Sequence, residues 1–352
     1  MLRRMFSMGS PRLNFGLIAD VQFADVDCAK SFDGKETRDY RGSLEHAKLA
    51  AARFQELGCM HVVQLGDFVD GKSNPESVPT RGPSGCPPGS RAALAKTLEA
   101  LRQVPGDAAP PFSLWHVRGN HEFYIAKNSV LKELLPLPKC PSTLAPPEYP
   151  DPDLTYYYFQ PIPGWRFIFL DGYDVSLARE AGHPAREEAL RLLQANNPGN
   201  PCAWGQGRGD FFAGVTGPAQ RWVPFNGGLG GKQLEWLSGV LKNCRQQGER
   251  AFVFSHILLF PDASGPSPAW PCLLFNYPQV LALLGEYKDV VKAVFSGHLH
   301  SGAFGLDDAG IAHISLPSPL THRNGAFAVA SLFDDRLEIC GSGAAESHCV
   351  KF

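Results

Sequence analysis

Short apolar runs recur along the chain and predict buried β-strands. They are rich in Val, Ile, Phe and Trp, and most are bounded by Gly, Asp or Asn. Continuous apolar runs of this length are typical of strands that are covered on both faces. The predicted strands are 15–20, 60–67, 111–120, 165–172, 250–256, 293–298, 311–316 and 326–333.

Between these runs, apolar residues recur at helical spacing. The predicted helices are 42–58, 90–104, 187–196, 231–244 and 277–287. Strands that alternate with helices indicate an α/β layered domain. We expect a flexible N-terminus over 1–12 and a single domain over 13–352. Pro/Gly/Ser-rich segments predict loop insertions near 72–89 and 136–152, and 183–222 is expected to be a cap-like insertion.

Composition narrows the function classes. The formal net charge of −2 argues against a nucleic-acid binder. No apolar stretch approaches the ~20 residues that a membrane span needs. The chain has 9 cysteines, an odd number, with no C-x-x-C pair, which favours reduced thiols in a cytoplasmic protein. We expect a monomer that acts on a small molecule.

Polar residues capable of binding metal follow five of the predicted strands. Alternate residues of a strand share a face, so side chains two positions apart leave it together. Taken singly, each residue has a plainer explanation as a helix cap, a turn residue or a buried histidine. The ordered set is harder to explain that way: Asp20 and Gln22, Asp67 and Asp70, Asn120 and His121, His256, and His298 and His300.

The order D-x-Q, GD-x-x-D, GNHE, H and GH-x-H resembles the signature of the calcineurin-like metallophosphoesterases. The resemblance implies a four-layer sandwich of two mixed β-sheets flanked by helices, with a dinuclear metal site at the strand ends. It further implies that Asp67 bridges the two ions. The other ligands would be Asp20, Gln22 and His300 for the first ion, and Asn120, His256 and His298 for the second.

The same resemblance places His121 beside the substrate, where it stabilises the transition state or protonates the leaving oxygen. Asp70 either orients a group behind the ligands or caps the segment that follows it. Two ions that share a carboxylate and a hydroxide favour attack of that hydroxide on phosphorus. Gln22 stands where many members of the family have His. Its amide oxygen is a harder ligand than imidazole, so we expect Mn²⁺, or Mg²⁺, to be preferred over Zn²⁺.

Within that family, the motifs FGLIADVQFAD, VVQLGDFVDG, VRGNHEFY, FNGG, LDGYDVS and SGHLHSG are similar to those of the manganese-dependent ADP-ribose/CDP-alcohol diphosphatases. This similarity implies cleavage of the pyrophosphate of ADP-ribose, CDP-choline, CDP-ethanolamine or CDP-glycerol. Arg41 would bind a phosphate or be a surface charge at a helix start. Phe225 and Asn226 would stack on and read the base, or belong to a loop that enters a helix.

Two other functions stay open at this stage. The same metal site serves phosphoprotein phosphatases and cyclic-nucleotide phosphodiesterases, because a fold does not fix its substrate. A non-catalytic binding scaffold on the same fold is a third possibility. It is disfavoured because every expected ligand, and His121, is present.

Overall fold

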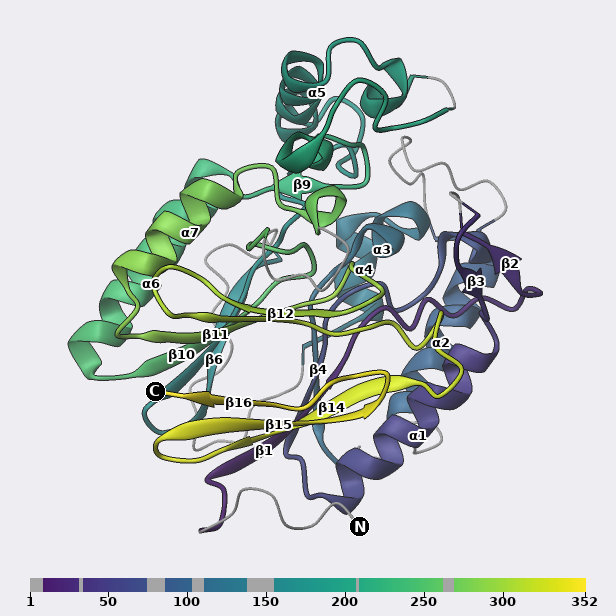
Figure 1. Ribbon diagram of the computed structural model, residues 1–352. Helices are drawn as coiled ribbons and strands as arrows, with labels where there is room; N and C mark the ends of the chain where they lie inside the picture. Colours follow the sequence, from purple (N-terminus) through teal and green to yellow (C-terminus); the bar gives the residue numbers. More distant parts are fainter. Residues whose placement is uncertain are drawn as a thin grey trace.

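Two six-stranded mixed sheets form the centre of the protein (Figure 1). The computed structural model describes residues 9–31, 34–74, 86–102, 111–137, 155–206, 209–261 and 269–352. The first sheet has the order β16 (His348–Lys351), β15 (Arg336–Gly343), β14 (Ala326–Leu332), β1 (Leu13–Ile18), β4 (His61–Gln64), β5 (Ser113–His116). The second has the order β12 (Ala303–Leu306), β13 (Ala312–Ser315), β11 (Val291–Ser296), β10 (Arg250–Phe254), β7 (Trp165–Phe169), β6 (Tyr157–Ile162).

The strands that precede the polar motifs run parallel within each sheet. β1, β4 and β5 are parallel neighbours in the first sheet. In the second sheet, β7, β10, β11 and β13 are parallel. The antiparallel strands lie at the margins, where β6 and β12 border the second sheet and β14 to β16 extend the first. The carboxyl ends of the parallel strands therefore collect the loops that carry the motifs.

Aromatic side chains fill the space between the two sheets. Phe15 of β1 packs edge-on against Phe167 of β7, with ring centroids 5.0 Å apart, and against Phe295 of β11 at 6.1 Å. Phe254 of β10 stacks on Phe295 at 5.3 Å. These residues are fully buried. Aromatic pairs in such geometries bury large apolar areas and fix the distance between the sheets.

Helices cover the outer faces of both sheets (Figure 1). The first sheet carries α1 (Gly42–Glu56) and α2 (Pro88–Arg102), and the second carries α6 (Gly231–Gln247) and α7 (Tyr277–Glu286). Phe54 of α1 lies so close to Gly16 of β1 that a Cβ there would be 2.7 Å from its ring. The four layers of helix, sheet, sheet and helix confirm the fold expected from the sequence.

A smaller unit stands beyond the sandwich, around α5 (Pro184–Asn196) (Figure 1). It falls within the predicted insertion 183–222. The unit also holds the single-turn helices η2 (Pro201–Trp204) and η3 (Gly217–Arg221). Its own apolar cluster includes Leu193, Trp222 and Phe275. Paired short strands β8 (Val175–Ser176) and β9 (Gly227–Gly228) lie where it joins the sandwich.

The shorter elements lie beside the sandwich. They are the hairpin of β2 (Ala29–Lys30) and β3 (Thr37–Arg38), the single turns η1 (Gly71–Ser73) and η4 (Trp270–Cys272), and the helices α3 (Asn120–Ile125) and α4 (Asn128–Leu134). Most of the predicted loops 72–89 and 136–152, and residues 1–8 of the predicted flexible terminus, lie outside the described residues. Within the described ranges, no helix combines the length and apolar character that a membrane crossing requires.

His61, at the start of β4, makes the stability of the fold dependent on pH. Its Nδ1 accepts a hydrogen bond of 3.1 Å from Trp115 Nε1, so the ring is neutral. Burial lowers the pKa of His61 from 6.5 to about 4. The folded state therefore binds fewer protons than the unfolded state between these values, and stability falls as the pH drops from 6.5 towards 4. The full loss is about 3 kcal/mol.

Replacing His61 with phenylalanine is expected to flatten this part of the stability profile. Chemical denaturation of wild type and His61→Phe across the same pH range measures the difference. The variant also leaves Trp115 Nε1 unpaired, which costs stability at every pH but does not change the slope. Parallel profiles for the two proteins would show that His61 does not account for the acid sensitivity.

Candidate metal centre

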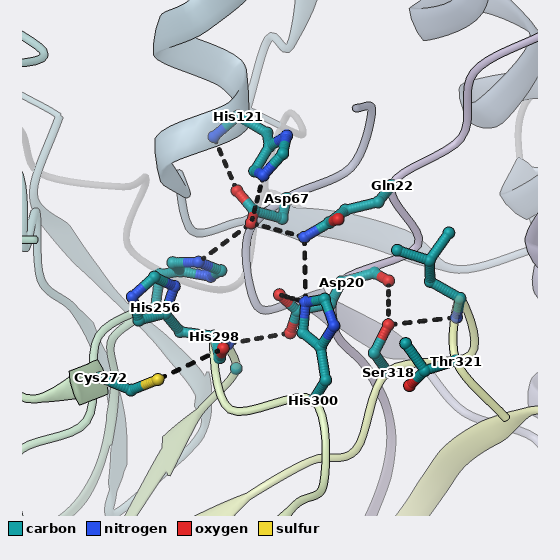
Figure 2. Close-up of polar contacts among 12 residues, drawn as sticks. Asp20, Gln22, Asp67, His121, His256, Cys272, His298, His300, Ser318 and Thr321 are labelled. Carbon is teal, nitrogen blue, oxygen red and sulfur yellow. Dashed lines mark hydrogen bonds and ion pairs between the residues drawn. The ribbon is translucent and has the colours of Figure 1, made fainter. Parts of the chain in front are cut away.

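Loops from both sheets bring the predicted polar residues to one place (Figure 2). Each of these residues follows a strand directly: β1, β4 and β5 of the first sheet, and β10 and β11 of the second. The residues brought together are Asp20, Gln22, Asp67, His121, His256, His298 and His300. Asn120 precedes His121 in the chain, and its side chain bonds Tyr173, whose ring centroid lies 6.1 Å from that of His256.

Glycine precedes several of these residues because their loops pack without room for a side chain. A Cβ on Gly66 would lie 2.2 Å from His256 Nδ1. One on Gly119 would lie 2.1 Å from Asp67 Oδ1. Real Cβ atoms do not approach other atoms so closely. The glycines of the GD and GN motifs therefore let the two loops close around Asp67.

The backbone is strained at the same place. Four described non-glycine residues have positive φ: Asp20 at 50°, Gln22 at 44°, Asp67 at 54° and His298 at 66°. All four belong to the predicted ligand set. Such conformations cost of order 1–3 kcal/mol each and persist where the surrounding structure imposes them, which is common at functional sites. Ser318, whose Oγ donates to Asp20 O at 2.7 Å, is one of the groups that hold this backbone.

Asp67 lies at the centre of the cluster. Its Oδ2 accepts a hydrogen bond of 2.8 Å from Gln22 Nε2 and lies 3.4 Å from His256 Nε2. Its Oδ1 accepts one of 2.8 Å from the backbone N–H of His121. Burial would raise the pKa of Asp67, but the imidazoles of His256 and His121 outweigh it and hold that pKa well below its usual range. Asp67 is therefore a carboxylate that faces ligand groups on two sides.

Several buried atoms of the cluster have no hydrogen-bond partner among the described residues: Asp20 Oδ1, Gln22 Oε1 and His256 Nε2. Buried polar atoms are normally satisfied, so each of these needs a partner. Asp67, His256 and His298 each offer a ligand atom within 4.8 Å of the others. Carboxylate, amide and imidazole groups are suitable ligands for Mn²⁺, and the residues present therefore fit a divalent cation.

The Gln22 side-chain amide lies between atoms that could also bind a cation. Its Nε2 donates to Asp67 Oδ2 and lies 3.1 Å from His300 Nε2, which lies 3.6 Å from Asp20 Oδ1. The N–H₂ group thus lies between Asp67 Oδ2 and His300 Nε2. Rotation of the amide by half a turn would put Oε1 in that position, as a metal ligand requires.

Backbone contacts orient His256 for the same task. Its Nδ1 donates to Leu65 O at 2.7 Å, which leaves Nε2 directed at Asp67. A hydrogen bond from the second ring nitrogen is the usual way in which a protein fixes a metal-binding imidazole.

Two tyrosines that the sequence analysis did not identify fix Asn120. The Tyr173 hydroxyl donates to Asn120 Oδ1 at 3.1 Å, and Asn120 Nδ2 donates to the Tyr124 hydroxyl at 3.1 Å. Both tyrosines are buried. Each end of the Asn120 amide is therefore held by a buried hydroxyl. Both tyrosines lie within motifs named from the sequence, Tyr124 in VRGNHEFY and Tyr173 in LDGYDVS, but the motifs do not show that they bond Asn120.

Glu122, the last residue of GNHE, joins the two loops around Asp67. Its carboxylate accepts hydrogen bonds from the backbone N–H groups of Asp67 at 2.9 Å, Phe68 at 2.5 Å and Gly119 at 2.7 Å. It is fully buried. The sequence contained this residue within a motif, but the motif alone does not show which backbone groups it holds.

His121 lies beside the ligands with its side chain 15% exposed. Its Nδ1 accepts a hydrogen bond of 3.0 Å from the backbone N–H of Gly71, so the proton of the neutral ring is on Nε2. That Nε2 lies 3.9 Å from Asp67 Oδ2. His121 is therefore arranged to hold a proton on the side facing the cluster.

Asp70 has features of both alternatives considered from the sequence. Its Oδ1 accepts from Lys72 N at 2.8 Å and caps η1, while Oδ2 lies 3.2 Å from His121 Nδ1. It thus closes the turn and adds negative charge behind the His121 ring.

Of the residues predicted to bind substrate, Arg41 is exposed and paired with carboxylates, whereas Phe225 lies beside the cluster. Arg41 is 53% exposed and forms ion pairs of 2.7 Å with Asp25 and with Asp27. Phe225 lies beside the cluster, with its ring centroid 6.1 Å from that of His298. The insertion adds Phe211, whose ring lies 5.6 Å from Phe225.

Asn226 differs from the expectation that it reads a base. It is fully buried, and its Nδ2 donates to two backbone carbonyls, those of Arg221 and Pro271. Its Oδ1 lies 2.8 Å from His298 Nε2. No polar atom of this amide is left for a base, because the loop folds the side chain inward, against His298.

Comparison with known proteins agrees with this arrangement. The chain is 31% identical to a manganese-dependent ADP-ribose/CDP-alcohol diphosphatase of Xenopus tropicalis, over 98% of this chain and 96% of the relative. It is 32% identical to the protein of the same name from Arabidopsis thaliana, over 96% of each. This chain belongs to that family. No family model matches the sequence.

A solved structure supports the family assignment at the level of the fold. The crystal structure of a dimetal phosphatase from Danio rerio superposes with a TM-score of 0.81 and 29% sequence identity, covering 97% of this chain and 100% of that one. The diphosphatase family therefore accounts for both the sandwich and the motifs at its strand ends.

Proposed function

We propose that this diphosphatase-family protein hydrolyses the pyrophosphate bond of ADP-ribose and of CDP-alcohols with two manganese ions. The products would be a nucleoside monophosphate and a phosphorylated sugar or alcohol. The observation that carries the proposal is the cluster around Asp67. There Asp20 Oδ1, Gln22 Oε1 and His256 Nε2 are buried without a hydrogen-bond partner among the described residues, and Asp67, His256 and His298 offer ligand atoms within 4.8 Å of one another. The named relatives are diphosphatases for these substrates.

Asp67 would be the shared ligand, because its Oδ2 faces Gln22 on one side and His256 on the other. The remaining ligands would be Asp20, Gln22 and His300 for one ion, and Asn120, His256 and His298 for the other. When bound, two divalent ions lower the pKa of a bound water and offset negative charge on phosphoryl oxygens.

His121 would donate Nε2–H to the leaving oxygen: in the neutral ring as a hydrogen bond that stabilises the developing negative charge, and in the doubly protonated ring as the proton itself. Its Nε2–H faces the cluster, and the Gly71 N–H bond to Nδ1 keeps that tautomer. Asp70 Oδ2, 3.2 Å from Nδ1, would accept a hydrogen bond from that nitrogen when the ring is doubly protonated. A non-catalytic binding scaffold is not supported, because each expected metal ligand and His121 are present.

Phe225 would stack on the nucleobase, since it lies at the edge of the cluster and remains partly exposed. Arg41 would bind a phosphate only by giving up Asp25 and Asp27. We also propose that the protein acts as a monomer in the cytoplasm, without nucleic-acid or membrane partners. The 8 described cysteines are free thiols, as expected of a reducing compartment.

The direct test is product analysis. Metal-stripped protein supplied with Mn²⁺ is expected to release AMP from ADP-ribose and CMP from CDP-choline, measured by chromatography. Phosphopeptides and cyclic nucleotides, tested in parallel, distinguish the other activities that this fold supports. No release from either pyrophosphate with any divalent ion would reject the proposal.

The Gln22 ligand makes a separate prediction about metal preference. Mn²⁺, and more weakly Mg²⁺, is expected to restore turnover to stripped protein better than Zn²⁺, because an amide oxygen is a harder ligand than imidazole. Gln22→His is expected to shift the preference towards Zn²⁺. Titration of turnover with each ion measures both proteins, and restoration of wild type by Zn²⁺ alone would contradict the prediction.

A further inference from the structure

The Asn226 amide has a defined orientation. Its Nδ2 lies 3.0 Å from Arg221 O and 2.7 Å from Pro271 O. Both partners are carbonyl oxygens, which can only accept hydrogen bonds, so the group that faces them must be the N–H₂. Because the side chain is fully buried, water offers no alternative partner. The other end of the amide, the oxygen, must therefore face His298.

That orientation determines the tautomer of His298. Asn226 Oδ1 lies 2.8 Å from His298 Nε2, and an amide oxygen can only accept. Nε2 therefore carries the proton of the neutral ring, and the lone pair is on Nδ1. We propose that Asn226 is a positioning residue that holds His298 in the Nε2–H form and thereby makes Nδ1 the metal ligand. The ligand role rests on the proposed function, whereas the tautomer does not.

The contact has a specific effect because it distinguishes the two nitrogens of the His298 ring. Its backbone has φ of 66°, and its N–H donates to Asp20 Oδ2 at 2.9 Å. These backbone contacts place the residue but do not select which ring nitrogen carries the proton. In the other tautomer, an N–H would point at the cation. Removing a group that orients a ligand typically costs about 10–100-fold in metal affinity.

The tautomer can be measured without metal. We expect long-range ¹H–¹⁵N correlation spectra of metal-free, ¹⁵N-labelled protein, at a pH where the ring is neutral, to show His298 as the Nε2–H form. The His298→Gln variant identifies its signals by their loss. A ring in the Nδ1–H form, or an even mixture, would overturn the proposal. This result does not depend on catalysis, so failure of the proposed activity would leave it standing.

Two substitutions test the consequence for metal. Both variants lose the bonds from Nδ2 to Arg221 O and Pro271 O. Asn226→Asp keeps an oxygen acceptor opposite Nε2, whereas Asn226→Leu removes it. We expect Asn226→Leu to bind Mn²⁺ about 10–100-fold more weakly by calorimetry, and Asn226→Asp to retain the Nε2–H form and most of the affinity. Equal Mn²⁺ affinity in Asn226→Leu and wild type would contradict the role.

Asn197 provides a matched control. It is a buried asparagine whose Nδ2 donates to two backbone carbonyls, Phe211 O and Trp222 O, both at 3.2 Å. It bonds no predicted ligand. Asn197→Leu therefore imposes a comparable loss of buried hydrogen bonds, and it should lower the melting temperature without changing the His298 tautomer. A changed tautomer in this control would show that general loosening, not the Asn226 contact, controls the ring.

Discussion

Replacing Asp67 with alanine is expected to abolish binding of both manganese ions and all measurable hydrolysis. Its carboxylate is the one group of the cluster that faces both Gln22 and His256, at 2.8 and 3.4 Å. No described neighbour is placed to substitute for it. Elemental analysis of the purified variant should find no bound manganese, and product release from ADP-ribose should fall to the uncatalysed rate.

A carboxylate at the opposite end of the second sheet provides the control. The Asp307 side chain is 7% exposed and pairs with His313 at 3.0 Å, in the turn that precedes β13. Asp307→Ala is expected to destabilise the protein but to keep both ions and turnover. Full manganese content in Asp67→Ala would show that Asp67 is not a shared ligand, provided that its circular dichroism matches wild type.

Replacing His121 with alanine is expected to lower turnover by ~10²–10⁴-fold while manganese content stays unchanged, because a positioned proton donor contributes about that much. The imidazole is held by the Gly71 N–H at Nδ1, which leaves Nε2 to hold the proton. The measurements are kcat with saturating Mn²⁺ and the manganese content of the same sample.

The His121 prediction can fail in two informative ways. Loss of manganese would show that His121 is a ligand. Unchanged turnover would remove it from the reaction. Asp70→Asn, which removes the carboxylate 3.2 Å from Nδ1, should lower turnover less than His121→Ala.

The sequence predicted much of the fold because its strands are covered on both faces. The eight apolar runs correspond to β1, β4, β5, β7, β10, β11, β13 and β14, and the five predicted helices to α1, α2, α5, α6 and α7. The antiparallel strands β6, β12, β15 and β16 were missed. In β6 and β15, buried and more exposed residues alternate, and the segments contain Pro (β6) or Gly (β15). Such segments lack the continuous apolar run from which the other strands were predicted.

The sequence predicted the site residues that directly follow strands. It did not predict contacts between side chains from segments that are distant in the sequence. The motifs named the residues that converge on Asp67. Asn226 was also named, but its buried amide and its contact with His298 depend on how three distant segments meet. The ion pairs of Arg41 with Asp25 and Asp27 could not be predicted either, because no sequence motif indicates them.

In the proposed centre, the Asp67 carboxylate is shared by two manganese ions. Anomalous scattering at the manganese edge, from crystals grown with Mn²⁺, tests this arrangement most directly. We expect two peaks per chain within the cluster, both within bonding distance of Asp67 and one bonded to His298 through Nδ1. A single peak, or peaks away from Asp67 in crystals of active protein, would contradict it.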